Sequence, residues 1–194
     1  RSAVLDGVTI LGAAGSTGID NILASPTIRN VTFRNHTFWA VNNNSSAPLF
    51  ENCSFLNNSN TPMRNLFSSV VVSNCVFDDN RSQFSAGMEN NQSTVQVIDS
   101  AFRRNLSQYG GSSINNANST SIVLNCTFEL NNAGLDGGAV ASGYGSYLRV
   151  VNSVFNGNSA WRGGALASWG RLELINNTII RNQAGISASG VLVA

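Results

Sequence analysis

Residues 148–166, LRVVNSVFNGNSAWRGGAL, contain the unit of which most of this chain is a variation. The unit has an apolar pair, an Asn, a Phe three residues later, a second Asn three residues further on, and then Gly-Gly-Ala followed by an apolar residue. Its aromatic position recurs every 22 to 27 residues, at Phe33, Phe55, Phe77, Phe102, Phe128, Phe155 and, with Ile in its place, Ile179. A period of this length indicates a solenoid, in which each unit buries its apolar face only by stacking on the next.

Two polar columns accompany the Phe column. The residues three positions before each Phe are Asn30, Asn52, Asn74, Asp99, Asn125, Asn152 and Asn176. The residues three positions after it are His36, Asn58, Asn80, Asn105, Asn131, Asn158 and Asn182. Asn is the non-glycine residue that adopts the left-handed αL conformation at least cost, so the first column predicts a sharp bend in every unit. We predict that the Phe rings and the bend residues, Asn74 and Asn152 among them, form structural ladders from coil to coil.

These columns predict an all-β fold, a right-handed parallel β-helix of about seven coils of 22–27 residues with three short strands per coil. In the opening unit the strands are expected at residues 164–168, 148–150 and 153–155, with the bend at residues 151–152. Polar segments between the first and second strands, residues 42–46, 89–94, 115–121 and 143–146, are expected to absorb the differences in length. Residues 1–27 are expected to form an incomplete first coil, residues 28–182 the regular coils, and residues 183–194 a final partial coil that another segment or chain continues or caps.

The composition limits the classes of partner. The 194 residues are 42% hydrophobic and only 11% charged, and 28 Asn and 26 Ser supply the polarity instead. A formal net charge of +1 produces no long-range field that would favour nucleic acid or an anionic membrane. No apolar run approaches the ~20 residues of a membrane-spanning helix. Because the chain starts at Arg1 without a Met, we expect a mature or trimmed product.

Acceptor sequences for N-glycosylation, Asn-X-Ser/Thr, are dense in this chain. An Asn-rich and Ser-rich sequence produces some of them by chance, but their number favours a secreted, extracellular or cell-surface glycoprotein. The candidate acceptors are Asn30, Asn35, Asn43, Asn44, Asn52, Asn57, Asn80, Asn91, Asn105, Asn118, Asn125 and Asn176.

The three cysteines directly follow first-column Asn residues, and their spacing fits neither a metal site nor a redox motif. Cys53 and Cys75 are predicted to be neighbours in adjacent coils, ~4.8 Å apart. That distance lies within the range for a disulfide, whereas stacked side chains point the same way rather than at each other. We therefore keep both alternatives, a Cys53–Cys75 disulfide and two free thiols, and expect Cys126 to be a small buried residue.

The FxxN and GGA(V/L) elements, as in Phe155 to Asn158 with Gly163 to Leu166, resemble the repeats of chlamydial polymorphic outer-membrane proteins and related β-helix adhesins. More widely, residues 28–182 resemble the pectin-lyase-like superfamily. The resemblance implies a cell-surface or extracellular scaffold. The dense acceptor sequences depart from what a bacterial passenger domain needs.

Because many members of that superfamily cleave polysaccharides, a carbohydrate-active enzyme is an alternative. Such chemistry needs paired carboxylates or a base with clustered acids. Asp78-Asp79 is the only acidic pair, and Arg103 and Arg104 are expected to stack on it. His36, the single histidine, is interpreted as a polar group of the second column rather than as a base. The sequence shows no nucleophile motif, metal cluster or cofactor motif, so we expect no enzyme and no cofactor.

The aromatic residues outside the Phe column suggest another alternative, a carbohydrate-binding module. They are Trp39, Tyr109, Tyr144, Tyr147, Trp161 and Trp169. An exposed ladder of Trp161, Tyr109 and Tyr144 would favour sugar binding. The leading hypothesis is a non-enzymatic, rigid β-helical rod that serves as a structural or adhesive segment of an extracellular glycoprotein. Its expected partners are copies or continuations of itself at the open coil ends, as in a filament or surface appendage, and surface carbohydrate or glycoproteins.

Overall fold

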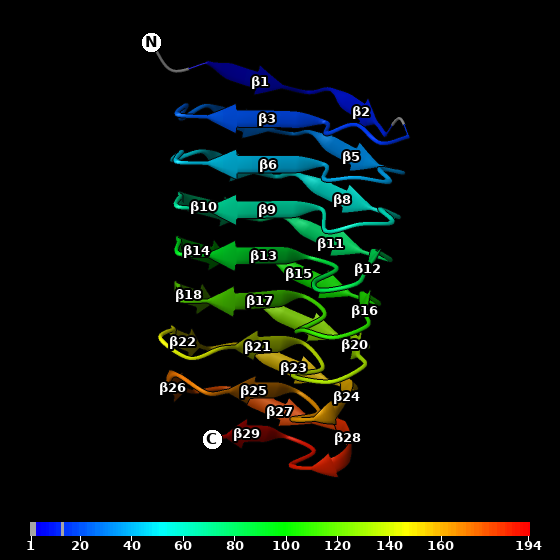
Figure 1. Cartoon of the computed structure of the whole chain (residues 1–194), viewed down its shortest axis with the longest axis vertical. Helices are drawn as coiled ribbons and strands as arrows, with labels where there is room; N and C mark the ends of the chain where they lie inside the picture. The colour runs from blue at the N-terminus through cyan, green and yellow to red at the C-terminus, as the bar shows by residue number, and fades with distance from the viewer. Residues whose placement is uncertain (1–2, 13) are drawn as a thin grey trace.

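The chain winds into a parallel β-helix of eight coils, which confirms the predicted all-β solenoid. The computed structural model describes residues 3–12 and 14–194, so Arg1, Ser2 and Ala13 of the expected first coil lie outside the described residues. Three eight-stranded sheets run along the long axis, and every strand pairs in parallel with its counterparts in the neighbouring coils (Figure 1). We number the coils 1 to 8 from the N-terminus.

Sheets A and B lie on either side of the predicted bend. Sheet A contains β1 (Val4–Asp6), β4 (Thr27–Arg29), β7 (Leu49–Glu51), β10 (Ser69–Ser73), β14 (Thr94–Ile98), β18 (Thr120–Leu124), β22 (Tyr147–Val151) and β26 (Arg171–Ile175). Sheet B contains β2 (Thr9–Leu11), β5 (Thr32–Arg34), β8 (Ser54–Leu56), β11 (Val76–Asp78), β15 (Ala101–Arg103), β19 (Thr127–Glu129), β23 (Val154–Asn156) and β27 (Thr178–Ile180).

The third face is sheet C, and a short fourth sheet, D, accompanies it in coils 4 to 8. Sheet C contains β3 (Ile19–Ile22), β6 (Val41–Asn44), β9 (Met63–Leu66), β13 (Met88–Asn91), β17 (Ile114–Ala117), β21 (Val140–Ser142), β25 (Leu166–Ser168) and β29 (Val191–Val193). Sheet D contains β12 (Arg81–Ser82), β16 (Leu106–Ser107), β20 (Asn132–Ala133), β24 (Ser159–Arg162) and β28 (Gln183–Ser187). The sequence predicted three strands per coil, and five coils have this fourth strand as well.

The structure has one coil more than the seven Phe-column units. Residues 1–27, expected to form an incomplete coil, contribute β1, β2 and β3, each paired with its counterpart in coil 2. Ile10 takes the Phe position in this coil, in register with Phe33. The columns are absent from the sequence there, but the alternation of inward and outward side chains is sufficient for pairing.

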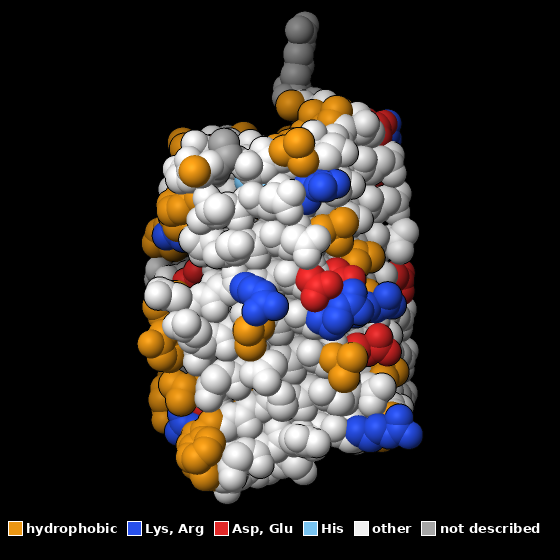
Figure 2. Space-filling model, turned by 90° about the vertical axis from the view of Figure 1, so that its right-hand side faces the viewer, with side chains coloured by type: hydrophobic (Ala, Val, Ile, Leu, Met, Phe, Trp, Pro, Cys, Tyr) orange, Lys and Arg blue, Asp and Glu red, His pale blue; other side chains and the backbone are white. Residues whose placement is uncertain are grey.

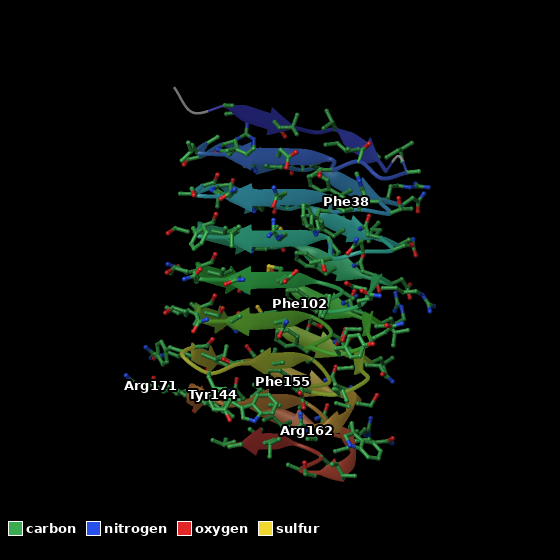
Figure 3. The ribbon with its side chains drawn as sticks, in the orientation of Figure 1. Phe38, Phe102, Tyr144, Phe155, Arg162 and Arg171 are labelled. Atoms are coloured by element: carbon green, nitrogen blue, oxygen red, sulfur yellow. The ribbon has the colours of Figure 1, made fainter. Side chains whose placement is uncertain are left out.

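The Phe column forms a continuous stack inside the helix. Six fully buried rings, from Phe33 to Phe155, lie parallel in adjacent coils. Their centroids are 4.4 to 5.0 Å apart, and the ring planes differ by only 5 to 8°. Figure 3 shows Phe102 and Phe155 between the sheets, pointing into the interior. Each ring buries apolar surface worth roughly 2 to 3 kcal/mol of transfer free energy.

The chain turns between sheets through single residues in the αL conformation. The first-column residues all adopt it, with φ between 50° and 55°, as the sequence predicted for Asn30, Asn52, Asn74, Asp99, Asn125, Asn152 and Asn176. The outward side chains of this column also form hydrogen bonds from coil to coil, as from Asn74 Nδ2 to Asn52 Oδ1 at 2.7 Å. Two further αL corners, after sheets B and C, were not predicted, and they include Leu23, Phe67 and Leu130.

The second Asn column forms a buried ladder. The side-chain oxygen of Asn105 accepts hydrogen bonds from both the backbone N–H and the Nδ2 of Asn80, at 3.2 and 3.0 Å. Asn105 in turn donates from Nδ2 to the carbonyl of Phe77 at 2.9 Å and to Asn131 Oδ1 at 3.1 Å. The same pattern repeats from coil to coil up to Asn182, so each coil is bonded to the next by side chains as well as by strands.

The predicted position of the variable loops is wrong for three of the four segments. Residues 143–146 do lie in a loop, between β21 of sheet C and β22 of sheet A. Residues 42–46, 89–94 and 115–121 overlap strands of sheet C, and most of the differences in length lie between sheets B and C instead. Asn43, Asn90 and Asn116 in these segments point inward and belong to a second buried amide ladder, with Nδ2-to-Oδ1 distances of 2.7 to 2.8 Å. Polarity in these segments therefore reflects hydrogen bonding inside the helix and not exposure.

Replacing a ring of the Phe stack should destabilise the protein strongly. We expect Phe102→Ala to lower the free energy of unfolding by about 3 to 5 kcal/mol, because it leaves a cavity between two parallel rings. Phe84→Ala is the control, since that ring is 52% exposed, and it should change stability by less than about 1 kcal/mol. Urea unfolding followed by circular dichroism measures both variants, and equal effects would contradict a stacked core.

Removing one amide of the Asn ladder should also be costly. We expect Asn105→Ala to destabilise the protein by roughly 2 to 4 kcal/mol, because the Asn80 N–H and the Phe77 carbonyl lose their buried partners. Asn132→Ala, at an exposed position in β20, should change stability by no more than about 0.5 kcal/mol. Urea unfolding measures both variants. If Asn105→Ala left the free energy of unfolding unchanged, the ladder would not be what holds the coils together.

Candidate functional site

A groove lies where the outline of the helix changes between coils 3 and 4. In coils 2 and 3 the chain passes directly from sheet B to sheet C, whereas from coil 4 onward it bulges out to form sheet D. The strand β12 is therefore the first of its sheet (Figure 1). The step leaves a groove of about 500 Å³, within the usual range for ligand pockets. Its lining residues are Phe38, Trp39, Ser59, Asn60, Thr61, Arg64, Gln83, Phe84 and Glu89.

Arg64 and Glu89 line the groove from neighbouring strands of sheet C, and Asn42 lies next to Arg64 on the other side. Asn42, Arg64 and Glu89 occupy equivalent positions in β6, β9 and β13. The guanidinium of Arg64 lies over the ring of Trp39, with its central carbon 4.5 Å from the ring centroid. It also donates from Nη1 to Asn42 Oδ1 at 3.3 Å. These two contacts fix the position of the cation in the groove.

Glu89 supplies a carboxylate next to this cation. Partial burial raises the pKa of Glu89 above its ordinary value, and the neighbouring charge of Arg64 opposes the shift. Sequence analysis does not single out Glu89, which belongs neither to the Phe column nor to the two Asn columns. The spacings of 22 and 25 residues from Asn42 to Arg64 and from Arg64 to Glu89, the same as in the Phe column, are the signal that would have grouped the three residues.

Aromatic side chains form the rim of the groove. Phe84 is half exposed, and its ring centroid lies 5.9 Å from that of Tyr109 in the next coil. A smaller groove of about 340 Å³ continues from the first, with which it shares Ser59 and Gln83. Together they combine aromatic planes with carboxylate, guanidinium, amide and hydroxyl groups, which is the mixture that recognises polar ligands with an apolar face.

Trp161, Tyr109 and Tyr144 do not form the single exposed ladder that would favour sugar binding. Tyr144 lies between β21 and β22, and Figure 3 shows it on the side of Arg171. Tyr109 follows β16 instead, and Trp161 lies in β24, packed over Gly185 of the next coil. The remaining predicted aromatics are covered by arginines, with Arg171 over Tyr147 at 4.8 Å and Arg162 over Trp169 at 5.3 Å.

The acidic pair is engaged by arginine, as expected for stacked partners. Arg104 binds both carboxylates, Asp79 through Nε at 3.1 Å and Asp78 through Nη2. Arg103 is in register with Asp78 but lies closer to Glu129, at 3.5 Å. Figure 2 looks onto the side of the molecule that carries sheet D and shows acidic and basic side chains gathered near its middle. Asp78 and Asp79 line neither groove.

The twelve glycosylation candidates differ in their exposure. Asn43, Asn80 and Asn105 are fully buried in the amide ladders, so a glycan at these positions does not fit the fold. Asn44 is half buried. The exposed candidates are Asn30, Asn35, Asn52, Asn57, Asn91, Asn118, Asn125 and Asn176.

Of the two alternatives for the cysteines, the structure has the free thiols. The sulfur of Cys75 accepts a hydrogen bond from the backbone N–H of Cys53 at 3.3 Å, and Cys75 N–H donates to Ser100 Oγ at 3.0 Å. Each thiol also donates to the carbonyl two residues earlier, as Ser100 does. Burial raises the pKa of Cys126 to about 11. Cysteine thus takes the place of serine in this file.

In residues 3–12 and 14–194, no helix is long and apolar enough to cross a membrane. Nor do three or more His, Cys, Asp or Glu side chains there come together in a way that would hold a metal ion.

Similarity to known proteins is confined to the fold. No curated protein matches the chain. PfbA, a surface adhesin of Streptococcus pneumoniae, is 13% identical with a TM-score of 0.44, and the alignment covers 81% of this chain and 60% of PfbA. QnrB1, a plasmid-mediated fluoroquinolone resistance protein, is 14% identical with a TM-score of 0.34, over 100% of this chain and 92% of QnrB1. At these scores neither likeness carries a functional argument.

The match of the sequence to a protein family is more informative than these structural likenesses. Residues 1–128, more than half of the chain, match the family described as the right handed beta helix region, and the chain therefore belongs to this family.

Proposed function

We propose that this chain is a rigid, non-enzymatic β-helical rod, a structural or adhesive segment of an extracellular or cell-surface glycoprotein. The observation that carries the proposal is the amide ladder, which bonds each coil to the next without a gap from Asn58 to Asn182. A molecule stiffened in this way holds groups at fixed distances along its axis. The enzyme alternative has less support, because Arg104 engages the carboxylates of Asp78 and Asp79.

The positions of the exposed acceptor residues support a glycoprotein. Asn30, Asn52, Asn125 and Asn176 lie at the αL corner between sheets A and B, where the side chain points away from the helix. Exposed corners of this kind can carry glycans, and their repetition from coil to coil would space the sugars along the rod. Sheet D and the groove carry no exposed acceptor among their residues.

Continuation or self-association at the coil ends remains part of the proposal. In coil 8, the inward-facing Leu172, Leu174 and Ile179 are only half buried, whereas Leu148 and Val150, the residues in register with the two leucines, are fully buried. The strands of this coil also form the edges of the sheets. A further coil or a second copy of the chain would cover both the apolar side chains and the strand edges.

Glycan mapping tests the glycoprotein proposal. When the chain is secreted from eukaryotic cells, we expect mass spectrometry to find glycans at exposed acceptors and none at Asn43, Asn80 or Asn105. As a control, Thr120→Ala should remove the glycan at Asn118 and no other. An antibody to the folded chain should label intact cells of the source organism. Folded protein without glycans, or labelling only after permeabilisation, would contradict the proposal.

A second candidate function is carbohydrate binding, and the groove between coils 3 and 4 favours it. The C–H face of a sugar ring packs against aromatic planes such as Phe84, while its hydroxyls pair with groups such as Glu89 and Arg64. The adhesive form of the rod would then bind surface carbohydrate through this groove.

Variants of the groove test sugar binding. On a glycan array, and by calorimetry with the best ligand, we expect Phe84→Ala and Glu89→Gln each to weaken binding about tenfold or more. Tyr144→Ala, at a residue 75% exposed and outside the groove, should bind as the unmodified protein does. An array without any bound glycan, or binding that is insensitive to both groove variants, would exclude this function for the groove.

A further inference from the structure

Coil 1 is the least buried coil of the first half of the helix. Its inward-facing apolar residues, Leu5, Ile10 and Ile19, are only partly buried, whereas Ile28, Phe33 and Val41 in the same positions of coil 2 are fully buried. Local opening requires the least free energy where the fewest apolar contacts are broken. Among the described residues of the first half, coil 1 therefore has the fewest apolar contacts to lose on opening.

The residue beneath coil 1 is the single histidine of the chain. His36 occupies the position that Asn holds in coils 3 to 8, and its side chain is 1% exposed. Its Nε2 lies 3.3 Å from the carbonyl of Ile10, so the ring donates this hydrogen bond just as Asn58 donates to the carbonyl of Phe33. Its backbone N–H donates to Asn58 Oδ1 at 3.0 Å.

The chain of coil 1 covers the imidazole closely. Gly18 and Gly12 leave no room for a side chain. A Cβ atom on Gly18 would lie 2.6 Å from the ring carbon Cε1 of His36, and one on Gly12 would lie 2.2 Å from the Cα of His36. The other ring nitrogen, Nδ1, is buried and has no hydrogen-bond partner in the structure. A proton on Nδ1 would therefore be both a buried charge and an unpaired donor.

Within residues 3–12 and 14–194, no ionisable side chain lies against the ring to compensate such a charge. The ring lies against the Ile10 carbonyl of β2, Gly18 of coil 1 and Phe33 of β5. The ionisable side chains of the surrounding strands, Asp6 of β1, Asp20 of β3 and Arg34 of β5, are exposed on the outside of the coils. Burial accordingly lowers the pKa of His36, and the hydrogen bond to Ile10 opposes the shift only in part.

We propose that coil 1 is an acid-sensitive cap, which detaches from coil 2 when Nδ1 of His36 takes up a proton. In the open state the imidazolium is solvated and its Nδ1–H finds water as a partner. In the closed state the pKa of His36 lies below its ordinary value of 6.5, and in the open state it is about that value. At a pH between these two pKa values the open state therefore binds more protons than the closed state. Opening is therefore favoured as the pH falls below about 6.5, and it uncovers the edges of β4, β5 and β6.

Hydrogen–deuterium exchange of the whole chain tests the proposal. Amides of β1, β2 and β3 should lose protection as the pH falls from 7.5 to 5, after correction for the intrinsic exchange rates. Because one proton is linked to opening, the opening constant should rise by at most tenfold per pH unit. Amides of β17 and β19 in the middle of the helix should keep their protection. Equal protection of coil 1 at both pH values would overturn the proposal.

A variant and a second measurement make the test specific. In His36→Asn the amide donates to Ile10 but does not titrate, so the protection of coil 1 should no longer depend on pH. A change of the same size in the variant would overturn the role of His36. The imidazole NMR signal of the unmodified chain, without a histidine tag, gives an independent answer if the variant does not fold. Titration at or above pH 6.5, with coil 1 still protected, would also overturn the proposal.

Discussion

The buried Asn side chain that recurs once per coil is the constraint on which the rest of the structure depends. Its oxygen accepts two hydrogen bonds from the Asn of the preceding coil, and its nitrogen donates to the carbonyl of a Phe. A strand pair alone can slip in register, but a slip here would leave several buried polar groups without partners. With the register fixed, the Phe rings stack face to face and the corners align.

Much of this arrangement could be predicted from the sequence, because it repeats. The columns of Phe and Asn gave the fold class, and the tolerance of Asn for αL gave the corner between sheets A and B. The other two corners were missed because they form no Asn column: residues such as Leu23, Phe67 and Arg104 adopt αL there against their own preference. There the hydrogen bonds between stacked coils impose the conformation, and these act only once the coils are stacked. The two-residue strands of sheet D were too short to give any pattern.

The candidate site was less accessible to sequence reasoning because it lies outside the columns that define the repeat. Arg64 and Glu89 come together through the register of sheet C, and the groove around them exists because one segment is longer than its counterpart in the coil before. Some Asn residues that the sequence analysis places in loops or among the glycan acceptors, such as Asn43, lie inside the helix and belong to an amide ladder. The same residue type serves both environments in this fold, so composition alone does not distinguish them.

The exchange of cysteine for serine in one file has a consequence for the conditions under which the chain folds. The thiols of Cys53 and Cys75 make the same backbone hydrogen bonds as the hydroxyl of Ser100, and no covalent link between coils is needed. Folding therefore requires no oxidant, and reducing agents have no disulfide to break in the native state. No contact of the three thiols therefore depends on a disulfide.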